Sequence, residues 1–349
     1  MSYSLQYPQF LFPGKKQTMD GVLHSSDNTF SLINSLNPFS WLKAAKWIIK
    51  EKPNYVIIRY WHPYFSICLS LIAKMLRRKS ICVIAWIDNI NPHESIPFQK
   101  YFISYFLNSC DGFLVMSDSV KNDLLKYKNN ALKNIIVCRH PIYNNFGESI
   151  SKIRAKKSLG IYSESSSNKS RYILFFGLIR QYKGLSLLLD VMAQKKILEL
   201  DVKLIIAGEF YDSKEKYIEK INNLGIENKV ILHDFYINNN DVVNYFCAAD
   251  MVVQPYLAAT QSGVSMVAYN FDKPILLTNV GGLAEYVDHK VNGYLVNPDI
   301  KEITLAIEDF YIYNREKIFS DMIKNNKSHY SWQNLAHEFD HLYKHLQHE

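Results

Sequence analysis

Hydrophobic and polar positions follow two different periods along most of this chain. Short apolar runs rich in β-branched and aromatic side chains predict buried strands. Longer segments, in which apolar residues recur every three or four positions, come between these runs and predict amphipathic helices. Because strand and helix alternate with little interruption, the pattern is typical of an α/β protein built on parallel sheets.

The first half of the chain carries four clear strand patterns and one weaker pattern. The weak one, at 2–7, leads into a loop rather than into a glycine turn and a helix. The clear strands are predicted at 55–58, 80–85, 112–116 and 134–138. Helices are predicted at about 40–51, 65–76 and 98–107, and Ser117 is expected to cap a further helix.

The helix at 40–51 allows two interpretations. It combines Trp41 and Trp47 with three lysines, so it either packs on a core or lies on anionic lipid. Pro53 and the strand at 55–58 follow at once in βα order, which favours the core-packed helix.

The second half repeats the alternation after a polar stretch. Strands are predicted at 172–176, 202–207, 230–232, 251–254 and 274–278, and helices from 184 and at 214–224, 241–248, 264–270, 300–313 and 331–347. Residues 146–170 are polar and serine-rich at their end, which predicts a linker. The expected domains are therefore 1–155, a linker at 156–170, a second domain at 171–330 and a closing helix at 331–349 that packs on the first domain.

Composition narrows the class of protein. The 349 residues are 48% hydrophobic and 14% aromatic, which excludes a disordered chain. The net charge of +7 suits phosphate-bearing ligands, an anionic membrane or nucleic acid, but the cations are dispersed and no nucleic-acid recognition module is visible. Five scattered cysteines without a C-x-x-C pattern predict a reduced, cytoplasmic protein. No run is apolar enough to span a bilayer, no secretory signal is visible, and no metal-ligand spacing stands out.

One turn carries the strongest chemical signal. A buried strand ends at Gly177, Arg180 and Lys183 follow in the turn, and Gly184 opens a helix. Turns of this kind lie at the carboxyl ends of parallel strands, where α/β proteins bind ligands. A guanidinium and an ammonium suit a diphosphate, although two solvated loop cations would give the same spacing.

The ordered motifs of the chain resemble those of glycosyltransferase family 4, the retaining GT-B enzymes that use nucleotide sugars. The motifs are VMSDSV (115–120), FFGLIRQYKGL (175–185), VKLIIAGEF (202–210), AADMVVQPY (248–256), KPILLTNVGGLAE (273–285) and VNGYLV (291–296). The resemblance implies two Rossmann-like domains with parallel sheets facing across a cleft. Two further segments, at 5–15 and 259–269, are similar to a subgroup from bacterial polysaccharide gene clusters, as for capsule or lipopolysaccharide.

The resemblance also implies a set of site residues. Arg180 and Lys183 would act on the donor phosphates. The other donor-binding positions would be Gly177, Gly208, Glu209, Phe235, Thr260, Gln261, Ser262, Gly263 and Val264. No metal and no cofactor are expected beyond the substrate itself, a UDP- or GDP-linked sugar.

The chain departs from the family at the donor-binding helix. Many members have two glutamates there, and counting back from Pro274 places these positions on Ala259 and Val267. Thr260, Gln261 and Ser262 are expected to supply neutral hydrogen bonds instead, unless they only cap a helix. The helix start at Gly263 can still offer backbone N–H groups to a phosphate.

A second departure concerns the first domain, where the family often has a histidine near the donor sugar. No histidine stands at the corresponding place near Ile87, so Asp88 and His62 are the nearest candidates for a catalytic role.

A third departure is at the start of the chain. The family opens with a strand, a Gly-Gly loop and a helix, whereas this chain resembles the family from the second strand onward. Low activity is therefore expected for this form, and turnover with and without an upstream segment would test that expectation.

The sequence thus predicts a retaining glycosyltransferase of cell-surface polysaccharide synthesis. Its acceptor would be a saccharide or a polyprenyl-linked saccharide, and it would be cytoplasmic or peripheral at the inner face of the membrane. Two alternatives stay open, another GT-B enzyme such as a sugar-nucleotide epimerase or a phosphorylase, and a non-catalytic GT-B subunit that binds a partner transferase.

Overall fold

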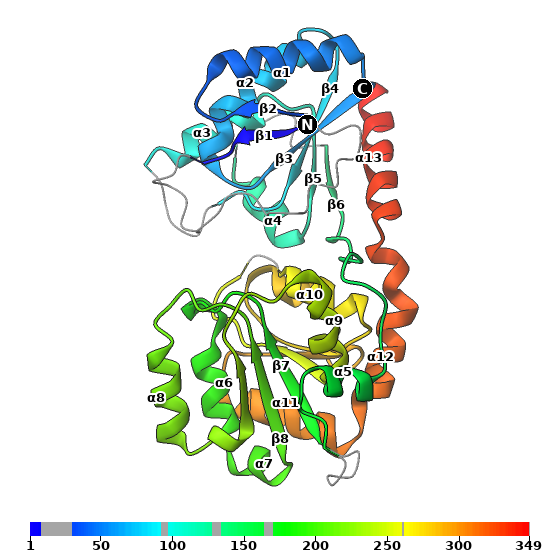
Figure 1. Cartoon of the computed structure of the whole chain (residues 1–349). Helices are drawn as coiled ribbons and strands as arrows, with labels where there is room; N and C mark the ends of the chain where they lie inside the picture. Colours follow the sequence, from blue (N-terminus) through cyan, green and yellow to red (C-terminus); the bar gives the residue numbers. More distant parts are fainter. Residues whose placement is uncertain (8–29, 92–96, 128–133, 164–169, 260–261, 349) are drawn as a thin grey trace. The chain divides into compact units, whose positions relative to one another are not determined.

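The computed structural model describes residues 1–7, 30–91, 97–127, 134–163, 170–259 and 262–348 (Figure 1). The chain divides into two compact units, Met1–Cys138 with Ala336–Glu349, and Arg139–Leu335. Each unit has a parallel sheet with helices packed on it, as the alternating sequence pattern predicts.

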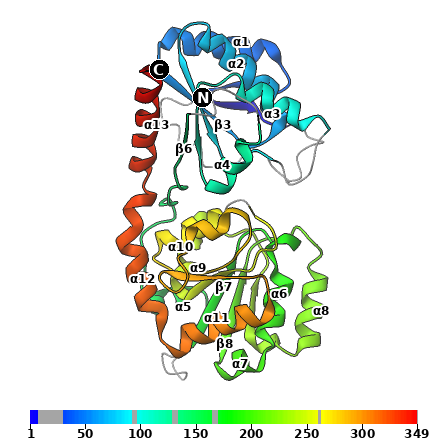
Figure 2. The same cartoon turned by 180° about the vertical axis from the view of Figure 1, so that it is seen from behind.

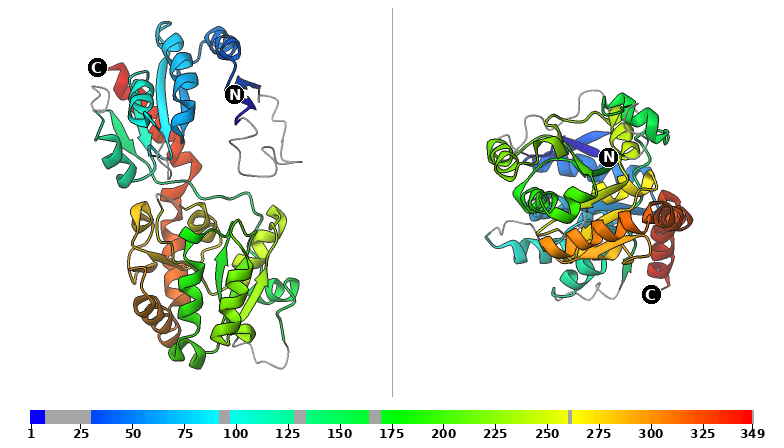
Figure 3. Two further views of the ribbon diagram at one scale, coloured as in Figure 1. Left: turned by 90° about the vertical axis from the view of Figure 1, so that its left-hand side faces the viewer. Right: turned by 90° about the horizontal axis from the view of Figure 1, so that it is seen from below.

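The first unit is built on the parallel sheet β3-β4-β5-β6. Its strands are β3 (Tyr55–Tyr60), β4 (Cys82–Ile87), β5 (Gly112–Val115) and β6 (Ile135–Val137). A separate parallel pair, β1 (Ser2–Leu5) and β2 (Ser31–Asn34), lies beside it (Figure 3). The helices are α1 (Pro38–Glu51), α2 (Ser66–Arg77), α3 (Gln99–Leu107), α4 (Asp118–Leu124) and part of α13 (Trp332–Gln347), with a 3-10 turn at Pro63–Phe65.

Alternate residues of β4 reach the two faces of this sheet. Val83 and Ala85 join the apolar core formed with α1, α2 and α3. On the other face, the Trp86 ring meets Phe339 of α13 edge-on with 5.9 Å between ring centroids. Gly112 leaves room for α13, because a Cβ there would lie 2.9 Å from Leu346.

The second unit has a parallel sheet in the order β12-β11-β10-β7-β8-β9. Its strands are β7 (Arg171–Phe176), β8 (Val202–Ala207), β9 (Val230–His233), β10 (Met251–Gln254), β11 (Ile275–Thr278) and β12 (Gly293–Val296). The chain leaves β7 in one direction toward β9 and returns to its other side at β10. This reversal of strand order is the place where open α/β sheets bind ligands, beyond the carboxyl ends of the strands.

Helices cover both faces of this sheet (Figures 1 and 2). One apolar layer involves α5 (Lys152–Ser158), α9 (Asn239–Ala248) and α10 (Gly263–Asn270). The other involves α6 (Leu185–Met192), α7 (Lys195–Glu199), α8 (Glu215–Leu224), α11 (Ile300–Ile312) and α12 (Arg315–Asn326). Four 3-10 turns lie at Gln181–Lys183, Glu227–Lys229, Gly281–Tyr286 and Lys327–Tyr330.

The main differences from the sequence prediction lie in segments of low hydrophobicity. The first unit ends at Cys138 rather than at 155, and the stretch read as a linker contains α5. Within this helix Ala155 is the buried apolar residue, and Lys152 pairs with both Asp250 and Glu316 at 2.6 Å. Helix α12 was missed for the same reason, because it buries only Phe319 and Ile323. Ion pairs leave no hydrophobic period in a sequence.

In the parts of the chain that the structure describes, every helix is too short or too polar to span a bilayer. The five cysteines are free thiols, and all but Cys82 are buried.

Replacing Gly184 by alanine should destabilise the second unit by about 2–4 kcal/mol. Gly184 has a φ of 71°, and a Cβ there would lie 1.9 Å from the Pro255 carbonyl oxygen. Gly160 is a matched control, because its φ of 68° is similar but no atom lies within 4 Å of its Cβ position. Urea denaturation should give a smaller loss for Gly160→Ala, and equal losses would show that the clash with Pro255 does not matter.

Candidate active site

The loops after β7 and β8 cross at two glycines. Gly177 has a φ of 96° and Gly208 a φ of 148°. A Cβ on Gly208 would lie 2.2 Å from the carbonyl oxygen of Gly177, so only glycine permits this crossing. Beyond the strands, Ile179 N–H donates to the Glu209 carbonyl at 2.8 Å, which ties the two loops together. The loop that carries Arg180 and Lys183 is therefore rigidly attached to the sheet.

Lys183 is a buried cation at this edge of the sheet. It is 9% exposed, and its Nζ lies 3.3 Å from the position of a Cβ on Gly177. The Tyr256 ring centroid is 5.7 Å from the same nitrogen. Burial, with a smaller contribution from Arg180, lowers the pKa of Lys183 to about 8. In the described residues no carboxylate pairs with it, so the site holds a positive charge without a protein anion.

Arg180 supplies the second cation of the loop. It stands in extended conformation just before the 3-10 turn that contains Lys183. Its guanidinium carbon lies 4.8 Å from the centroid of the Tyr211 ring, which supports the side chain from one side. Two cations of like charge held on one short loop repel each other, and an anion with two charges would relieve that repulsion.

The start of α10 faces the same glycine. Val264 Cγ2 lies 3.5 Å from the Cβ position of Gly177, so Gly177, Lys183 and the first turn of α10 come together. Ser262 precedes the helix in extended conformation, but its side chain makes no capping hydrogen bond. It bonds instead with Tyr256, where it partly opposes the rise that burial causes in the pKa of that phenol. The simple interpretation of Ser262 as a helix cap is therefore wrong.

The other residues predicted to bind the donor contact residues other than Gly177 and Lys183, or lie outside the described residues. Glu209 is half-buried, and its backbone carbonyl is used in the loop pairing. Phe235 follows β9, is 55% exposed and stacks on His233. Thr260 and Gln261 lie outside the described residues. The two positions counted for the family glutamates, Ala259 and Val267, are buried in the apolar core, so a carboxylate there would need a different environment.

Asp88 and His62 in the first unit both have structural partners. Asp88 follows β4, is 6% exposed and pairs with Arg59, with 2.6 Å between Oδ2 and Nε. His62 Nδ1 accepts a hydrogen bond from Tyr64 N–H at 3.2 Å, and burial lowers the pKa of His62. A catalytic role for Asp88 or His62 stays a prediction.

Sequence reasoning missed two tyrosines near Lys183 and the start of α10. Tyr256 is buried beside Lys183, and Tyr143 packs its ring 3.1 Å from the Cβ position of Gly263. Tyr143 hydrogen-bonds His140 Nε2 at 3.1 Å. An aromatic residue two positions after the end of a buried strand was the available signal for Tyr256. Within the described parts of the chain, no three histidine, cysteine or acidic side chains form a metal-holding group.

Affinity for a nucleoside diphosphate should fall above pH 8. The pKa of Lys183 is about 8 in the free protein, and a bound anion would raise it. Above pH 8 binding must then take up a proton, so affinity should drop about tenfold from pH 7 to pH 9. Titration calorimetry at both pH values would measure this, with Lys183→Met as the control that should lack the step. Equal affinities of the unmodified protein at both pH values would contradict it.

Comparison with known proteins shows similarity to glycosyltransferases. Residues 170–311 match the family described as Glycosyl transferases group 1. An uncharacterized glycosyltransferase of Methanocaldococcus jannaschii is 28% identical over 294 residues, which cover 76% of this chain and 70% of the relative. The lipopolysaccharide 1,2-N-acetylglucosaminetransferase of Salmonella typhimurium is 28% identical over 185 residues, or 48% of this chain and 46% of that enzyme.

Solved structures show the same fold. The Anabaena protein HepE, crystallised in complex with UDP, has a TM-score of 0.70 at 18% identity, with 89% of this chain and 85% of HepE covered. At this identity the likeness concerns the fold alone, which is GT-B with parallel sheets, as the sequence predicts.

Proposed function

We propose that this chain is a group 1 glycosyltransferase that transfers a sugar from a nucleotide-sugar donor, with the donor diphosphate on Arg180, Lys183 and the first turn of α10. The match of residues 170–311 to the group 1 family supports the activity. The observation that carries the proposal is Lys183, a buried cation with no carboxylate partner in the described residues. Burying such a charge costs stability, and a bound diphosphate would offset that cost.

In the proposed reaction, the bond between the anomeric carbon and the donor phosphate oxygen breaks. The acceptor hydroxyl oxygen bonds the anomeric carbon, and its proton leaves with the released diphosphate. Negative charge grows on the leaving phosphate as the bond breaks. In this proposal Lys183 and Arg180 stabilise that charge, and the low exposure of Lys183 strengthens its part of the interaction.

The finer features of the proposal come from the resemblance and the relatives. Transfer would proceed with retention of the anomeric configuration. Of the expected UDP- and GDP-linked sugars, we propose a UDP-linked donor, since HepE was crystallised with UDP and with UDP-glucose. The acceptor would be a saccharide or a polyprenyl-linked saccharide of a cell-surface polysaccharide, in line with the Salmonella lipopolysaccharide relative. The protein would work in the cytoplasm, at or near the inner face of the membrane.

Product analysis tests the function. UDP- and GDP-linked sugars would be incubated with the protein, with and without polyprenyl-diphosphate-linked saccharides and lipopolysaccharide cores as acceptors. A transferase should release nucleoside diphosphate in equal amount to glycosylated product, and NMR of that product should show the donor's anomeric configuration. Interconversion of donors without acceptor would identify an epimerase. Nucleotide binding without any product would identify a non-catalytic subunit.

A further inference from the structure

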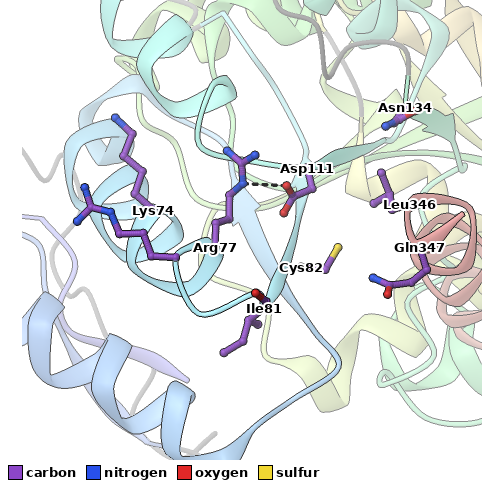
Figure 4. A pocket seen from close by; sticks show the side chains of 10 residues that line it. Lys74, Arg77, Ile81, Cys82, Asp111, Asn134, Leu346 and Gln347 are labelled. Atoms are coloured by element: carbon purple, nitrogen blue, oxygen red, sulfur yellow. Dashed lines mark ion pairs between the residues drawn. The ribbon is translucent and has the colours of Figure 1, made fainter. Parts of the chain in front are cut away.

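A cavity of about 660 Å³ opens at the amino edge of the sheet in the first unit (Figure 4). It lies where β4, β5 and β6 begin, at the opposite end of the sheet from Asp88, and it belongs to a different unit from the loop that carries Arg180 and Lys183. Its volume is in the range of small-molecule sites. The lining residues are Lys74, Arg77, Arg78, Ser80, Ile81, Cys82, Asp111, Asn134, Leu346 and Gln347.

Three of these residues are cations from the end of α2. Basic residues at such a position often cap the last carbonyls of a helix. Here those carbonyls already have backbone partners, because Arg78 N–H donates to Lys74, Ser80 N–H to Arg77, and Ile81 N–H to Leu76. Ser80 has a φ of 57° and closes the helix end. The side chains of Lys74, Arg77 and Arg78 are therefore not needed as caps.

Arg77 is held in a defined orientation. Its Nε pairs with Asp111 Oδ1 at 2.8 Å, the ion pair drawn in Figure 4, and its Nη1 donates to the Asn108 carbonyl at 3.1 Å. The second Asp111 oxygen accepts from Val83 N–H at 2.8 Å. Asp111 is thus occupied by the protein, and the guanidinium keeps further N–H groups for a ligand.

The other two cations are not neutralised by nearby acids. Lys74 Nζ lies 3.6 Å from the centroid of the Tyr105 ring. Arg78 is exposed and, in the described residues, forms no ion pair. Among the described residues that line the cavity, Lys74, Arg77 and Arg78 are cations and Asp111 is the one acid. This excess creates a positive field that attracts anions.

Apolar side chains continue from the cations along the same face of α2. Ile67 and Leu71 are 45% and 38% exposed and stand four residues apart, followed by Lys74 and Arg78 at helical spacing. The cavity wall also contains Leu346. A ligand with a phosphate next to an apolar part would match this arrangement.

We propose that this cavity binds a phosphate group through Lys74, Arg77 and Arg78, either as free phosphate or as the headgroup of an anionic lipid. The proposal is independent of the proposed donor site, since the residues belong to the first unit.

Titration of the full chain with inorganic phosphate tests the proposal, with UDP present to fill the donor site. The unmodified protein should bind phosphate, and the double variant Lys74→Gln with Arg78→Gln should bind it about a hundredfold more weakly. Lys79→Gln is the matched control, because Lys79 adjoins the same helix end but does not line the cavity. The charge-preserving pair Lys74→Arg with Arg78→Lys should keep binding, which separates lost charge from lost folding.

Sedimentation with vesicles separates the two sources of phosphate. Binding to phosphatidylglycerol vesicles but not to phosphatidylcholine vesicles, lost in the double variant and kept in Lys79→Gln, would identify a lipid headgroup. Phosphate binding without vesicle binding would identify a free phosphate ligand. The proposal is wrong if neither phosphate nor vesicles bind. It is also wrong if Lys79→Gln loses as much phosphate affinity as the double variant.

Discussion

Replacing Lys183 by methionine is expected to weaken UDP binding and to stabilise the unliganded protein at the same time. The variant loses a charge-assisted hydrogen bond to the diphosphate, which should cost about 10- to 100-fold in affinity. With Arg180→Ala added, the loss should reach about 1,000-fold. Without ligand, removal of a buried cation that lacks an acidic partner in the described residues should raise the free energy of unfolding by on the order of 1–3 kcal/mol at pH 7.

Chemical denaturation with and without UDP would measure both effects. Lys195→Met is a suitable control, because the Lys195 side chain is 89% exposed. Its ion pair with Glu199, at 3.8 Å, lies on the surface and should contribute little to stability. That variant should change neither quantity measurably. A Lys183→Met protein that is less stable than the unmodified chain and binds UDP equally well would show that the lysine is structural.

Replacing Asp250 by alanine should destabilise the second unit by about 3–5 kcal/mol. Asp250 is 6% exposed and accepts hydrogen bonds from Tyr172 N–H at 2.8 Å and the Tyr311 hydroxyl at 3.0 Å, besides its ion pair with Lys152. Its loss leaves the Tyr172 N–H and the Tyr311 hydroxyl without their acceptor in a largely buried place, and Lys152 keeps only its pair with Glu316. Urea denaturation would measure the effect.

The Asp190–Lys220 pair provides the comparison for Asp250. Its 2.6 Å contact is equally short, but the Asp190 side chain is 30% exposed, so Asp190→Ala should cost under about 1 kcal/mol. Asp250 lies at the amino end of β10, whereas Lys183 lies beyond the carboxyl end of β7. The UDP affinity of the folded Asp250→Ala variant should therefore be unchanged. A similar stability loss in both variants would contradict the role assigned to burial.

The elements that were predicted best are those in which local sequence and packing agree. Strands β8 and β10 have the predicted bounds, since each is a short apolar run ended by a glycine or a proline. Ser117 caps α4 as predicted, with its hydroxyl accepting from Val120 N–H at 3.1 Å. Helix α5 was missed because Ala155 is its only buried apolar residue and Lys152 pairs with residues distant in sequence.

The part of the candidate site that lies on one sequence motif was predicted, and the contacts between distant segments were not. Gly177 and Lys183 lie on one continuous motif, and the structure brings Val264 to them. The pairing of Asp88 with Arg59 depends on two adjacent strand ends, and strand register cannot be read from one sequence. The position of Tyr256 beside Lys183 likewise follows from the strand order, in which β10 lies next to β7.

A nucleoside diphosphate should bind the loop that carries Arg180 and Lys183. Thermal stabilisation by UDP, GDP, ADP and CDP, measured on the unmodified chain and on the Arg180→Ala, Lys183→Ala double variant, tests it most directly. A nucleotide at about one hundred times its dissociation constant should add roughly 2.7 kcal/mol of stability. We predict such a shift with UDP and its loss in the double variant. A shift that persists in the double variant, or no shift with any nucleotide, would contradict the account.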